Sequence, residues 1–270
     1  MKADQIVEKF EVIPTPIPLL NEILAGGVPT KLITEIAGPP GVGKSTLGLQ
    51  ILAQAQRLGR PTYYADAERA VEFVKFATAI GVDCSQLEYD KQDFAEDLLE
   101  NVRKWVDENK RGVIVVDAIG ALLARAEAEK SMEGAVIGVQ SKMIAKFCRV
   151  LAPYLDKNNH ALIVINHVYT DMGTGALKSS GGQKLDYHKG LAVWLKPTYG
   201  KAPKRSADGT KTVKFVDAEI RNKAKYPLAV DGRKVTMEFI QKQGFVGEYV
   251  QAPEKKKSGR PAKASPQIKE

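Results

Sequence analysis

Cysteine and histidine are scarce in this sequence. Its 270 residues include two cysteines, Cys84 and Cys148, and three histidines, with no CxxC pair and no His-rich stretch. A structural zinc site needs closely spaced Cys or His ligands, and a disulfide-stapled domain needs more cysteines than these. The scarcity therefore argues against both classes and favours a reducing compartment.

Long apolar runs are also absent. No run of about 18 apolar residues occurs, and the N-terminal MKADQIVEKFEVIP holds no apolar stretch of signal-peptide length. We therefore expect no membrane association and a cytoplasmic location. Hydrophobic residues make up 44% and charged residues 27% of the chain, a composition typical of a globular protein with a substantial core.

Acidic residues are outnumbered, 32 against 40 basic ones, which gives a net charge of +8. Half of that excess lies in the segment 253–270, where six basic residues and two acidic ones leave +4. The six are Lys255, Lys256, Lys257, Arg260, Lys263 and Lys269, and the two are Glu254 and Glu270. A basic balance favours polyanionic partners, although a solvated run of charge gives the same composition.

From Lys31 onward, β-rich apolar runs alternate with helical patterns. KLITEIAG is followed by STLGLQILAQAQRL, PTYYADAE by VEFVKFATAIG, and GVIVVD and ALIVINHV flank a long helical segment. This alternation predicts an α/β fold with a mostly parallel central sheet flanked by helices. The later runs VWLKP, VKFVDAEIRNK and VTMEFIQ are separated by turn residues and predict an antiparallel extension.

The composition divides the chain into three parts. Residues 1–13 predict a short amphipathic helix, with Ile6, Val7 and Phe10 apolar, that leads into an extended segment. Residues 14–249 predict a folded core. Residues 250–270 have no apolar periodicity and predict a basic, disordered tail.

The run GPPGVGKST is the most specific motif. It matches G-x-x-x-x-G-K-[ST], follows the predicted strand KLITEIA and precedes a predicted helix, which is the context of a phosphate-binding loop. Its glycines let backbone N–H groups converge on phosphate oxygens. We expect Lys44 to reach the β and γ phosphates and Ser45 to ligate Mg²⁺. The predicted nucleotide-binding residues are Gly38, Pro39, Pro40, Gly41, Val42, Gly43, Lys44, Ser45 and Thr46.

Acidic residues end two other predicted strands. Asp117 closes GVIVVD and is predicted to hold Mg²⁺ opposite Ser45. Asp66 and Glu68 follow the strand PTYYA, and Glu68 is a candidate general base for an attacking water. A structural interpretation is also open, in which Asp66 caps a helix and Glu68 lies in its first turn. The two interpretations are compatible.

The pair Asn166-His167 closes the strand ALIVIN. A polar pair in this place could sense a γ-phosphate and pass its presence to the segment that follows, and a purely structural histidine fits the sequence as well. That segment, TDMGTGALKSSGG (170–182), is rich in glycine, as is AEAEKSMEGAVIG (126–138) to a lesser degree. Long loops of this kind are usually functional or disordered.

Taken in order, these residues resemble the RecA family of DNA strand-exchange recombinases. The resemblance covers roughly residues 14–245. Its parts are the run from IPLLNEILAGG through the glycine-rich motif to YYADAE, GVD at 81–83, VIVVDAIGALLAR, INHV, SGG at 180–182 and EIRNKAKYP near 219–227. It implies a RecA-like ATPase core over residues 14–249 that uses ATP and Mg²⁺.

The resemblance also assigns roles by position. Glu68 matches the catalytic glutamate of the family, and His167 stands where most members carry a glutamine that couples the γ-phosphate to DNA. The Asn-His pair is similar to that of some bacteriophage recombinases. Arg221 and Lys223 match basic residues that reach the ATP of a neighbouring subunit, and guanidinium stabilises transferring phosphate charge well.

Further positions follow from the same resemblance. Tyr187 matches an aromatic residue of the subunit contact, Phe76 could lie against adenine, and residues 1–13 with Phe10 stand where the family has its polymerisation arm. The glycine-rich segments, here taken as 126–138 and 168–182, match the two loops that line DNA. The DNA contacts implied there are Lys130 and Lys178 on phosphates, Met132 and Met172 between bases, and the backbone amides of Gly181 and Gly182.

The chain departs from bacterial members in three ways. The segment before the core is short, the folded core is expected to stop near residue 250 without the additional C-terminal domain of those members, and the tail is basic where theirs is acidic. KKKSGRPAK resembles a minor-groove AT-hook, but no arginine precedes its glycine. A solvated run of charge is the alternative for this tail.

The sequence thus predicts an ATP-dependent recombinase that forms a helical filament on single-stranded DNA and pairs it with a homologous duplex. A single-strand-binding protein or a loader are possible further partners. Two alternatives stay open. One is a ring-forming, helicase-type motor on the same core, and the other is a recombination mediator that binds DNA or a true recombinase without strand exchange.

Overall fold

The computed structural model describes residues 10–129, 138–173, 175–180, 183–206, 209–221 and 230–246. Several predictions fall on residues outside these ranges: most of the helix expected within residues 1–13, the tail 250–270, and the site residues Lys130, Met132, Gly181, Gly182 and Lys223. The described end of the first of these segments, residues 10–13, is not helical and leads into a short strand at Val12–Ile13. None of the helices among the described residues is long and apolar enough to cross a membrane.

Strands and helices alternate along the first two thirds of the chain, and strands dominate the last third. The strands are β1 (Val12–Ile13), β2 (Val28–Pro29), β3 (Ile33–Gly38), β4 (Thr62–Asp66), β5 (Leu87–Asp90), β6 (Val113–Asp117), β7 (Ala161–Thr170), β8 (Leu177–Ser179), β9 (Leu191–Pro197), β10 (Lys204–Arg205), β11 (Thr212–Ile220), β12 (Lys234–Ile240) and β13 (Gly244–Val246). The helices are α1 (Pro18–Ile23), α2 (Lys44–Arg57), α3 (Phe73–Ile80), α4 (Ala95–Glu108), α5 (Arg125–Ala128), α6 (Val139–Lys157) and α7 (Gln183–His188), with short 3₁₀ turns η2 (Cys84–Gln86) and η3 (Ile119–Ala121).

One large sheet organises the described residues, with the strand order β13-β12-β11-β9-β3-β7-β6-β4-β5. The strands from β9 to β5 are parallel, and β11, β12 and β13 continue the sheet in antiparallel pairing. The predicted α/β fold with an antiparallel extension is therefore confirmed. Because parallel strands share a direction, the carboxyl ends of β3, β4, β6 and β7 lie at one edge of the sheet.

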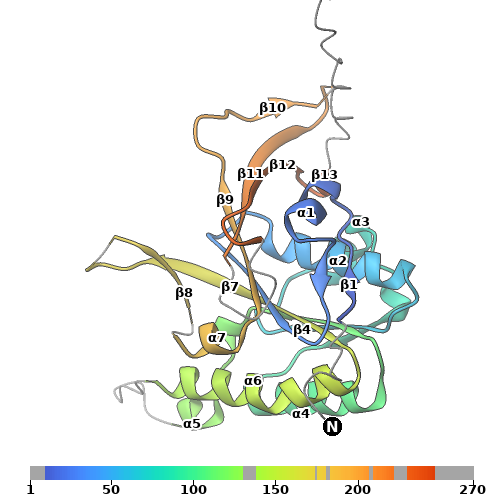
Figure 1. Cartoon of the computed structure of the whole chain (residues 1–270), viewed down its shortest axis with the longest axis vertical. Helices are drawn as coiled ribbons and strands as arrows, with labels where there is room; N and C mark the ends of the chain where they lie inside the picture. The colour runs from blue at the N-terminus through green and yellow to red at the C-terminus, as the bar shows by residue number, and fades with distance from the viewer. Residues whose placement is uncertain are drawn as a thin grey trace, which may run out of the picture.

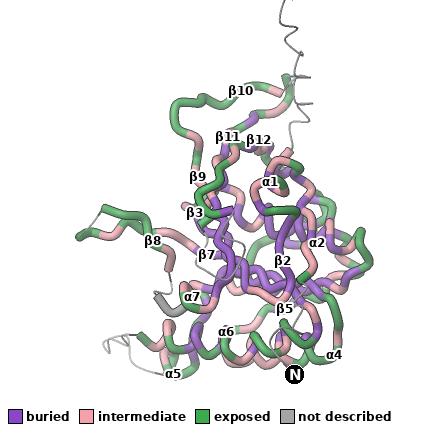
Figure 2. Tube along the Cα trace, in the orientation of Figure 1, coloured by how far each residue is buried: buried purple, intermediate pink, exposed green. Residues whose placement is uncertain are grey.

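Helices cover both faces of this sheet, which gives three layers (Figures 1 and 2). Side chains of β6 alternate between the two faces. Val113 and Val115 pack in the cluster that contains the apolar residues of α1, α2 and α3, and Ile114 and Val116 pack with those of α4 and α6. Burial on both faces removes each of these side chains from water and contributes about 1.5–3 kcal/mol for a fully buried Val, Leu or Ile.

The strand β7 is longer than the sequence predicted. It continues past Asn166 to Thr170 because residues 168–170 pair with β8 in an antiparallel hairpin. The end of β7 and β8 project from the body of the molecule (Figure 1), where no core face imposes an apolar pattern. The segment 170–182, predicted as a loop, is therefore in part a hairpin. The β-favouring residues Val168, Tyr169 and Thr170 were the available signal.

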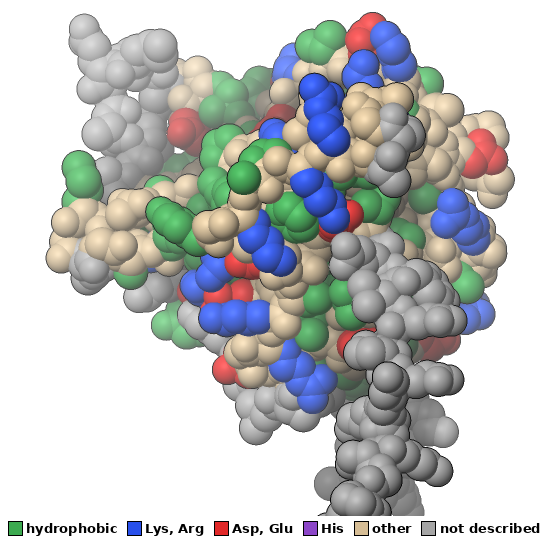
Figure 3. All heavy atoms as spheres, turned by 90° about the horizontal axis from the view of Figure 1, so that it is seen from above, with side chains coloured by type: hydrophobic (Ala, Val, Ile, Leu, Met, Phe, Trp, Pro, Cys, Tyr) green, Lys and Arg blue, Asp and Glu red, His purple; other side chains and the backbone are tan. Residues whose placement is uncertain are grey.

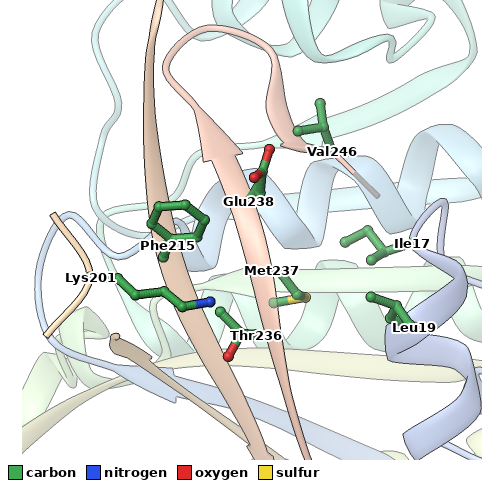
Figure 4. Close-up of a pocket in the computed structure, with 8 residues that line it drawn as sticks. All are labelled: Ile17, Leu19, Lys201, Phe215, Thr236, Met237, Glu238 and Val246. Carbon is green, nitrogen blue, oxygen red and sulfur yellow. The ribbon is translucent and has the colours of Figure 1, made fainter. Parts of the chain in front are cut away.

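The antiparallel extension packs against α1. Met237 of β12 points toward Ile17 and Leu19 at the start of α1, and a small cavity of about 50 Å³ remains between them (Figure 4). Such a space admits a few water molecules. It is much too small for a nucleotide, so we assign it a packing role.

His160 joins the start of β7 to α4 and β6. Its Nδ1 accepts a hydrogen bond from the backbone N–H of Gly112, and its Nε2 lies 2.9 Å from the carbonyl oxygen of Val106. Since an N–H group can only donate, Nδ1 carries no proton and Nε2–H donates to Val106. Burial lowers the pKa of His160, and the bonds to Val106 and Gly112 offset this only in part.

We expect the stability of the fold to fall on acidification through this residue. The unfolded chain takes up a proton at His160 near pH 6.5, whereas the folded chain resists it to a lower pH, so the stabilisation is complete above about pH 6.5 and is lost below it. His160→Gln, whose amide can make both hydrogen bonds without titrating, should lose less stability between about pH 7.5 and 5.5. Urea unfolding followed by circular dichroism measures this, and parallel pH profiles for the two proteins would contradict it.

Candidate functional site

The glycine-rich turn joins β3 to α2. Gly38 ends the strand, and a Cβ at this position would stand 2.5 Å from the carbonyl oxygen of Leu195, so only glycine fits. Gly43 precedes α2 with φ of 99°, a left-handed conformation that glycine adopts without strain. Backbone N–H groups at the start of a helix have no intrahelical acceptor and form an anion-binding site. The strand–turn–helix geometry is therefore the one a phosphate-binding loop requires.

Lys44 begins α2 and is buried. Its Nζ donates a hydrogen bond to the carbonyl oxygen of Pro39 at 3.0 Å, which holds the side chain across the turn. Burial lowers the pKa of Lys44, and the charges of Glu68 and Asp117 oppose that shift. A desolvated cation gains from additional negative charge. The turn therefore favours an anionic ligand, and a phosphate group meets this requirement.

Asp117 lies at the end of β6, directly opposite Asp66 of β4 in the register of the two strands. Burial raises the pKa of Asp117, although the hydroxyl of Ser45 and that of Tyr64, which donates to Oδ2, work against the rise. The second carboxylate oxygen, Oδ1, is buried and accepts no hydrogen bond from the residues that the structure describes. A buried carboxylate oxygen with no donor fits a cation ligand, which supports the predicted Mg²⁺ role of this residue.

A magnesium ion here would depend on more than the protein. Within the described ranges, no three His, Cys, Asp or Glu side chains lie close enough together to hold a metal by themselves. Mg²⁺ commonly binds one or two protein oxygens together with substrate phosphates and water. Asp117 and the hydroxyl of Ser45, in the first turn of α2, are the protein ligands that this arrangement offers.

Asp66 organises the turn that follows β4. Its carboxylate accepts hydrogen bonds from the backbone N–H groups of Arg69 and Ala70 at 2.7 and 2.9 Å, and from the hydroxyl of Tyr89 at 2.7 Å. The helix-capping interpretation is therefore wrong, because α3 begins only at Phe73, and Asp66 instead closes a turn. Glu68 lies within this turn and is exposed.

Glu68 and His167 meet beside the glycine-rich turn. The Oε1 atom of Glu68 contacts Nε2 of His167, and both side chains are partly exposed. His167 stands opposite Gly38 in the register of β3 and β7. The structure thus brings the candidate base and the candidate sensor together at the first residue of the turn. Their catalytic roles remain predictions.

Asn166 connects three elements from a fully buried position. Its Nδ2 donates hydrogen bonds to Oε1 of Glu35 on β3 and to the carbonyl oxygen of Ser180, both at 2.8 Å. The backbone N–H of Ser180 in turn donates to the carbonyl oxygen of His167 at 2.9 Å. The end of the glycine-rich segment 170–182 is therefore attached directly to the Asn-His pair.

Glu35 and Lys189 form a buried ion pair that the sequence analysis missed. Glu35 lies within β3, and its carboxylate contacts Nζ of Lys189, which also lies 2.5 Å from Asp186 of α7. Removing one member of a buried pair leaves an uncompensated charge, so such pairs fix the elements that carry them. The available signal was a lone glutamate inside the otherwise apolar strand KLITEIA. The pair ties α7 to the strand that leads into the glycine-rich turn.

Arg221 lies elsewhere on the sheet. It follows β11, and its backbone N–H donates to the carbonyl oxygen of Ala192 at 2.8 Å. Ala192 pairs with Glu35, which precedes the glycine-rich turn, and β11 runs antiparallel to β9. The chain therefore leaves β11 heading away from the edge that holds Gly38, Asp117 and His167. The exposed guanidinium of Arg221 is directed by this topology to a different part of the surface.

A basic hollow lies between α6 and α7. It measures about 240 Å³ and is lined by Lys142, Ala145, Arg149, Tyr187 and His188. Lys142 and Arg149 are exposed on α6, and the side chain of Tyr187, a predicted contact residue, is 67% exposed on α7. The two glycine-rich segments end where α6 and α7 begin. Basic residues spaced along one face of α6 were the signal for this hollow, which the sequence analysis did not use.

The β7–β8 hairpin presents apolar side chains to solvent. Met172 is fully exposed at its tip, and Tyr169 and Leu177 are about half exposed. Lys178, a predicted phosphate contact, forms an ion pair with Asp171 at 2.6 Å. Exposed apolar groups on a projecting hairpin are costly in water unless they have a partner, so this hairpin is a candidate binding element.

For two further predicted residues, Phe76 and Phe10, the structure gives the location, and their roles stay predictions. Phe76 lies on α3, half-buried against the core cluster, and its contact with adenine stays a prediction. Phe10 is partly exposed before β1.

On the antiparallel extension, Lys201 and Lys204 lie over the ring of Phe215, and Lys204 also pairs with Glu238. Figure 3 shows this end of the molecule, where Lys and Arg are dispersed among hydrophobic and acidic side chains.

Comparison with known proteins shows which family this sequence resembles. The family model described as the RecA N-terminal domain matches residues 1–244. The RecA protein of Nautilia profundicola is 33% identical over 228 residues, which are 83% of this chain and 61% of that protein. The RecA protein of Thermus aquaticus is 36% identical over 189 residues, 68% of this chain and 55% of that protein. A mitochondrial DNA repair protein recA homolog of Dictyostelium discoideum is 35% identical over 190 residues, 69% of this chain and 42% of that protein. The matches thus span less than two thirds of the length of each of these relatives.

We expect Asn166→Leu to weaken both the fold and the anchoring of the β8 end. Leucine has a similar size but no donor, so Glu35 and the carbonyl of Ser180 each lose a hydrogen bond, at a cost of about 1–3 kcal/mol each. Urea unfolding should show the loss, and hydrogen exchange should show faster opening at residues 177–180. Thr170→Val, at the exposed end of β7, is the matched control. Unchanged exchange in Asn166→Leu would show that the side chain does not hold this segment.

Proposed function

The chain belongs to the RecA family, and from this premise we propose that it is an ATP-dependent DNA recombinase that forms filaments on single-stranded DNA and promotes homologous pairing and strand exchange. One observation supports this most directly. The strand β7 carries His167 beside the glycine-rich turn and, a few residues later, the exposed β7–β8 hairpin. A nucleotide site and a DNA-binding element on one strand can influence each other without a long pathway.

The chain's own residues supply the parts of ATP hydrolysis. Lys44 and the backbone N–H groups of residues 41–45 hold the β and γ phosphates. Asp117 and Ser45 hold Mg²⁺, which when bound neutralises charge on the phosphate oxygens. Glu68 orients the attacking water and accepts its proton, and His167 is the hydrogen-bond partner that keeps the Glu68 carboxylate in place.

Arg221 completes the site of a neighbouring subunit. The antiparallel direction of β11 carries it away from the nucleotide edge of its own chain, so a second copy must bring an arginine to the phosphates. A contact between two different surfaces of identical subunits does not have to close, and one that does not close yields a helical filament. Lys223, Tyr187 and Phe10 belong to the same proposed contact.

DNA binds along the β7–β8 hairpin and the basic hollow. Lys142 and Arg149 contact phosphates, and the exposed side chains of Tyr169, Met172 and Leu177 lie against bases. Such contacts read no base edges and make binding independent of sequence. Lys178 joins them when phosphate replaces Asp171 as its partner. Lys130, Met132, Gly181 and Gly182 remain proposed contacts on the adjoining segments.

The Asn166-His167 pair and the family also suggest the source of the protein, its location and its further partners. The imidazole at position 167 is shorter than the glutamine of most members, and it favours a bacteriophage type of recombinase. Such a protein would act in the cytoplasm of a host cell, on DNA covered by a single-strand-binding protein or opened by a loader.

Two alternatives lead to different assemblies, and one experiment separates them. ATP hydrolysis is measured with and without single-stranded DNA, and the same samples are imaged by negative-stain electron microscopy. Strong stimulation with helical filaments supports the recombinase and leads to a strand-exchange assay. Rings instead of filaments would contradict the recombinase and support a helicase-type motor. DNA binding with neither stimulation nor filaments would contradict the recombinase and support a mediator.

Glu68→Gln should slow ATP turnover strongly and leave ATP binding intact. The amide cannot accept the proton of water, and a positioned base contributes about 10²- to 10⁴-fold, so kcat should fall within that range while ATP affinity stays near wild type. Glu72→Gln, an exposed glutamate four residues later, is the control. Equal turnover in Glu68→Gln and wild type would remove Glu68 from the mechanism.

The double variant Lys142→Ala/Arg149→Ala should bind single-stranded DNA more weakly at every sequence. Each cation that contacts a phosphate of single-stranded DNA steepens the plot of log affinity against log salt concentration by about 0.7. Because the double variant loses two such cations, its slope should be shallower by about 1.4. Fluorescence anisotropy of labelled oligonucleotides over a salt series gives this slope. Lys110→Ala/Lys157→Ala removes two exposed charges elsewhere, and an equal change there would mean that net charge, not the hollow, sets the affinity.

A further inference from the structure

Arg221 is held in a defined place before any partner arrives. Its Cζ atom lies 4.0 Å from the centroid of the Trp194 ring. Trp194 belongs to β9 and pairs with Glu219 of β11 in the strand register, so Glu219, two residues before Arg221, stands beside the ring. The guanidinium therefore rests on an aromatic surface presented by the neighbouring strand.

Glu219 restrains the same guanidinium from the side. Its Oε1 atom lies 3.4 Å from Nε of Arg221, and its Oε2 atom lies 3.5 Å from Lys196 and 3.6 Å from Lys234. Burial alone would raise the pKa of Glu219, but Arg221, Lys234 and Lys196 outweigh it and lower the pKa. Glu219 thus stays ionised between three cations. It engages Arg221 at Nε, on the stem side of the guanidinium, so this contact does not occupy the two terminal nitrogens.

Such a support matters most for an exposed, flexible side chain. An arginine side chain has many rotamers, and an unsupported one loses this conformational freedom when it engages a ligand. A cation over the face of a Trp ring is attracted by the ring even at an exposed site. A group already oriented for developing charge needs little reorganisation at the moment of reaction. The ring and the carboxylate therefore lower the cost of using Arg221.

We propose that Trp194 is a positioning residue for Arg221, and that Glu219 fixes the guanidinium on its ring. The inference rests on the proposed function, in which Arg221 reaches the ATP of a neighbouring subunit. In that arrangement Trp194 touches no nucleotide and acts only through Arg221. It sets the rate at the neighbour's site and leaves the site of its own chain unchanged.

Trp194→Leu and Trp194→Phe test the stacking. Leucine keeps apolar bulk but removes the aromatic face, so kcat of the DNA-stimulated ATPase should fall about 2- to 5-fold, the equivalent of about 0.5–1 kcal/mol. KM for ATP should stay near wild type, because the ATP contacts of each chain's own turn are intact. Phenylalanine keeps a face and should restore most of the loss. Equal kcat for all three proteins would overturn the proposal.

Mixed assemblies show where the defect acts. Glu68→Gln subunits are expected to hydrolyse ATP very slowly but carry an intact Trp194–Arg221 unit. Mixing them with Arg221→Ala subunits should restore turnover at sites formed between the two, and mixing them with Trp194→Leu subunits should do the same. If Trp194 matters only for the fold of its own chain, mixing Trp194→Leu with Glu68→Gln subunits should give no gain in ATP turnover. That result would overturn the proposal.

The outcomes separate the two levels of inference. No gain with Arg221→Ala would show that Arg221 does not act on a neighbour, and the proposed function would lose its shared site. A gain with Arg221→Ala but none with Trp194→Leu would leave the shared site standing and remove Trp194 from it. Two controls ensure that a folding defect is recognised. In urea, Trp194→Leu should lose no more stability than its lost contact with Arg221 accounts for, and its binding to single-stranded DNA should stay at the wild-type value.

Discussion

The pairing of β3 with β7 is the constraint on which the candidate site depends. It places Gly38 opposite His167, and Asn166 of β7 donates to the buried Glu35 of β3. Hydrogen-bonded parallel strands hold their register, because a slip of one residue would turn every side chain to the other face. Glu35 would then leave its buried partner Lys189, and His167 would leave Glu68. The fixed register of β3 and β7 therefore keeps Gly38, His167 and Glu68 in their places relative to one another.

The sequence predicted the parts of this molecule that repeat local rules. Alternating apolar runs gave the parallel sheet, and the glycine-rich motif with its flanking strand and helix gave the turn before Lys44. Asp117 and His167 were found because parallel strands end at a common edge, so that polar residues at strand ends gather there. Each of these inferences needs only a short window of sequence and one general property of sheets.

What the sequence did not predict depends on partners far apart in the chain. Lys189 meets Glu35 only because α7 folds back onto β3, and Lys189 alone is indistinguishable from a surface lysine. Trp194 meets Arg221 only because β9 pairs with β11 in one particular register. The β7–β8 hairpin extends into solvent, where burial imposes no alternation and the glycine content suggested a loop. The ion pair, the Trp194–Arg221 contact and the hairpin are all determined by long-range pairing of the chain and not by local propensity.

The antiparallel extension has a consequence for assembly under the proposed function. A strand that reverses direction after β9 carries its end away from the edge where the parallel strands end, so Glu68 and Arg221 lie at separate places on one chain. Both are needed for hydrolysis if Arg221 stabilises the transferring phosphate, and one chain cannot supply both to one ATP. ATP then becomes part of the contact between subunits, and its binding stabilises the assembled form by mass action. Hydrolysis removes that stabilisation, so the geometry of a single sheet makes assembly on DNA dependent on nucleotide.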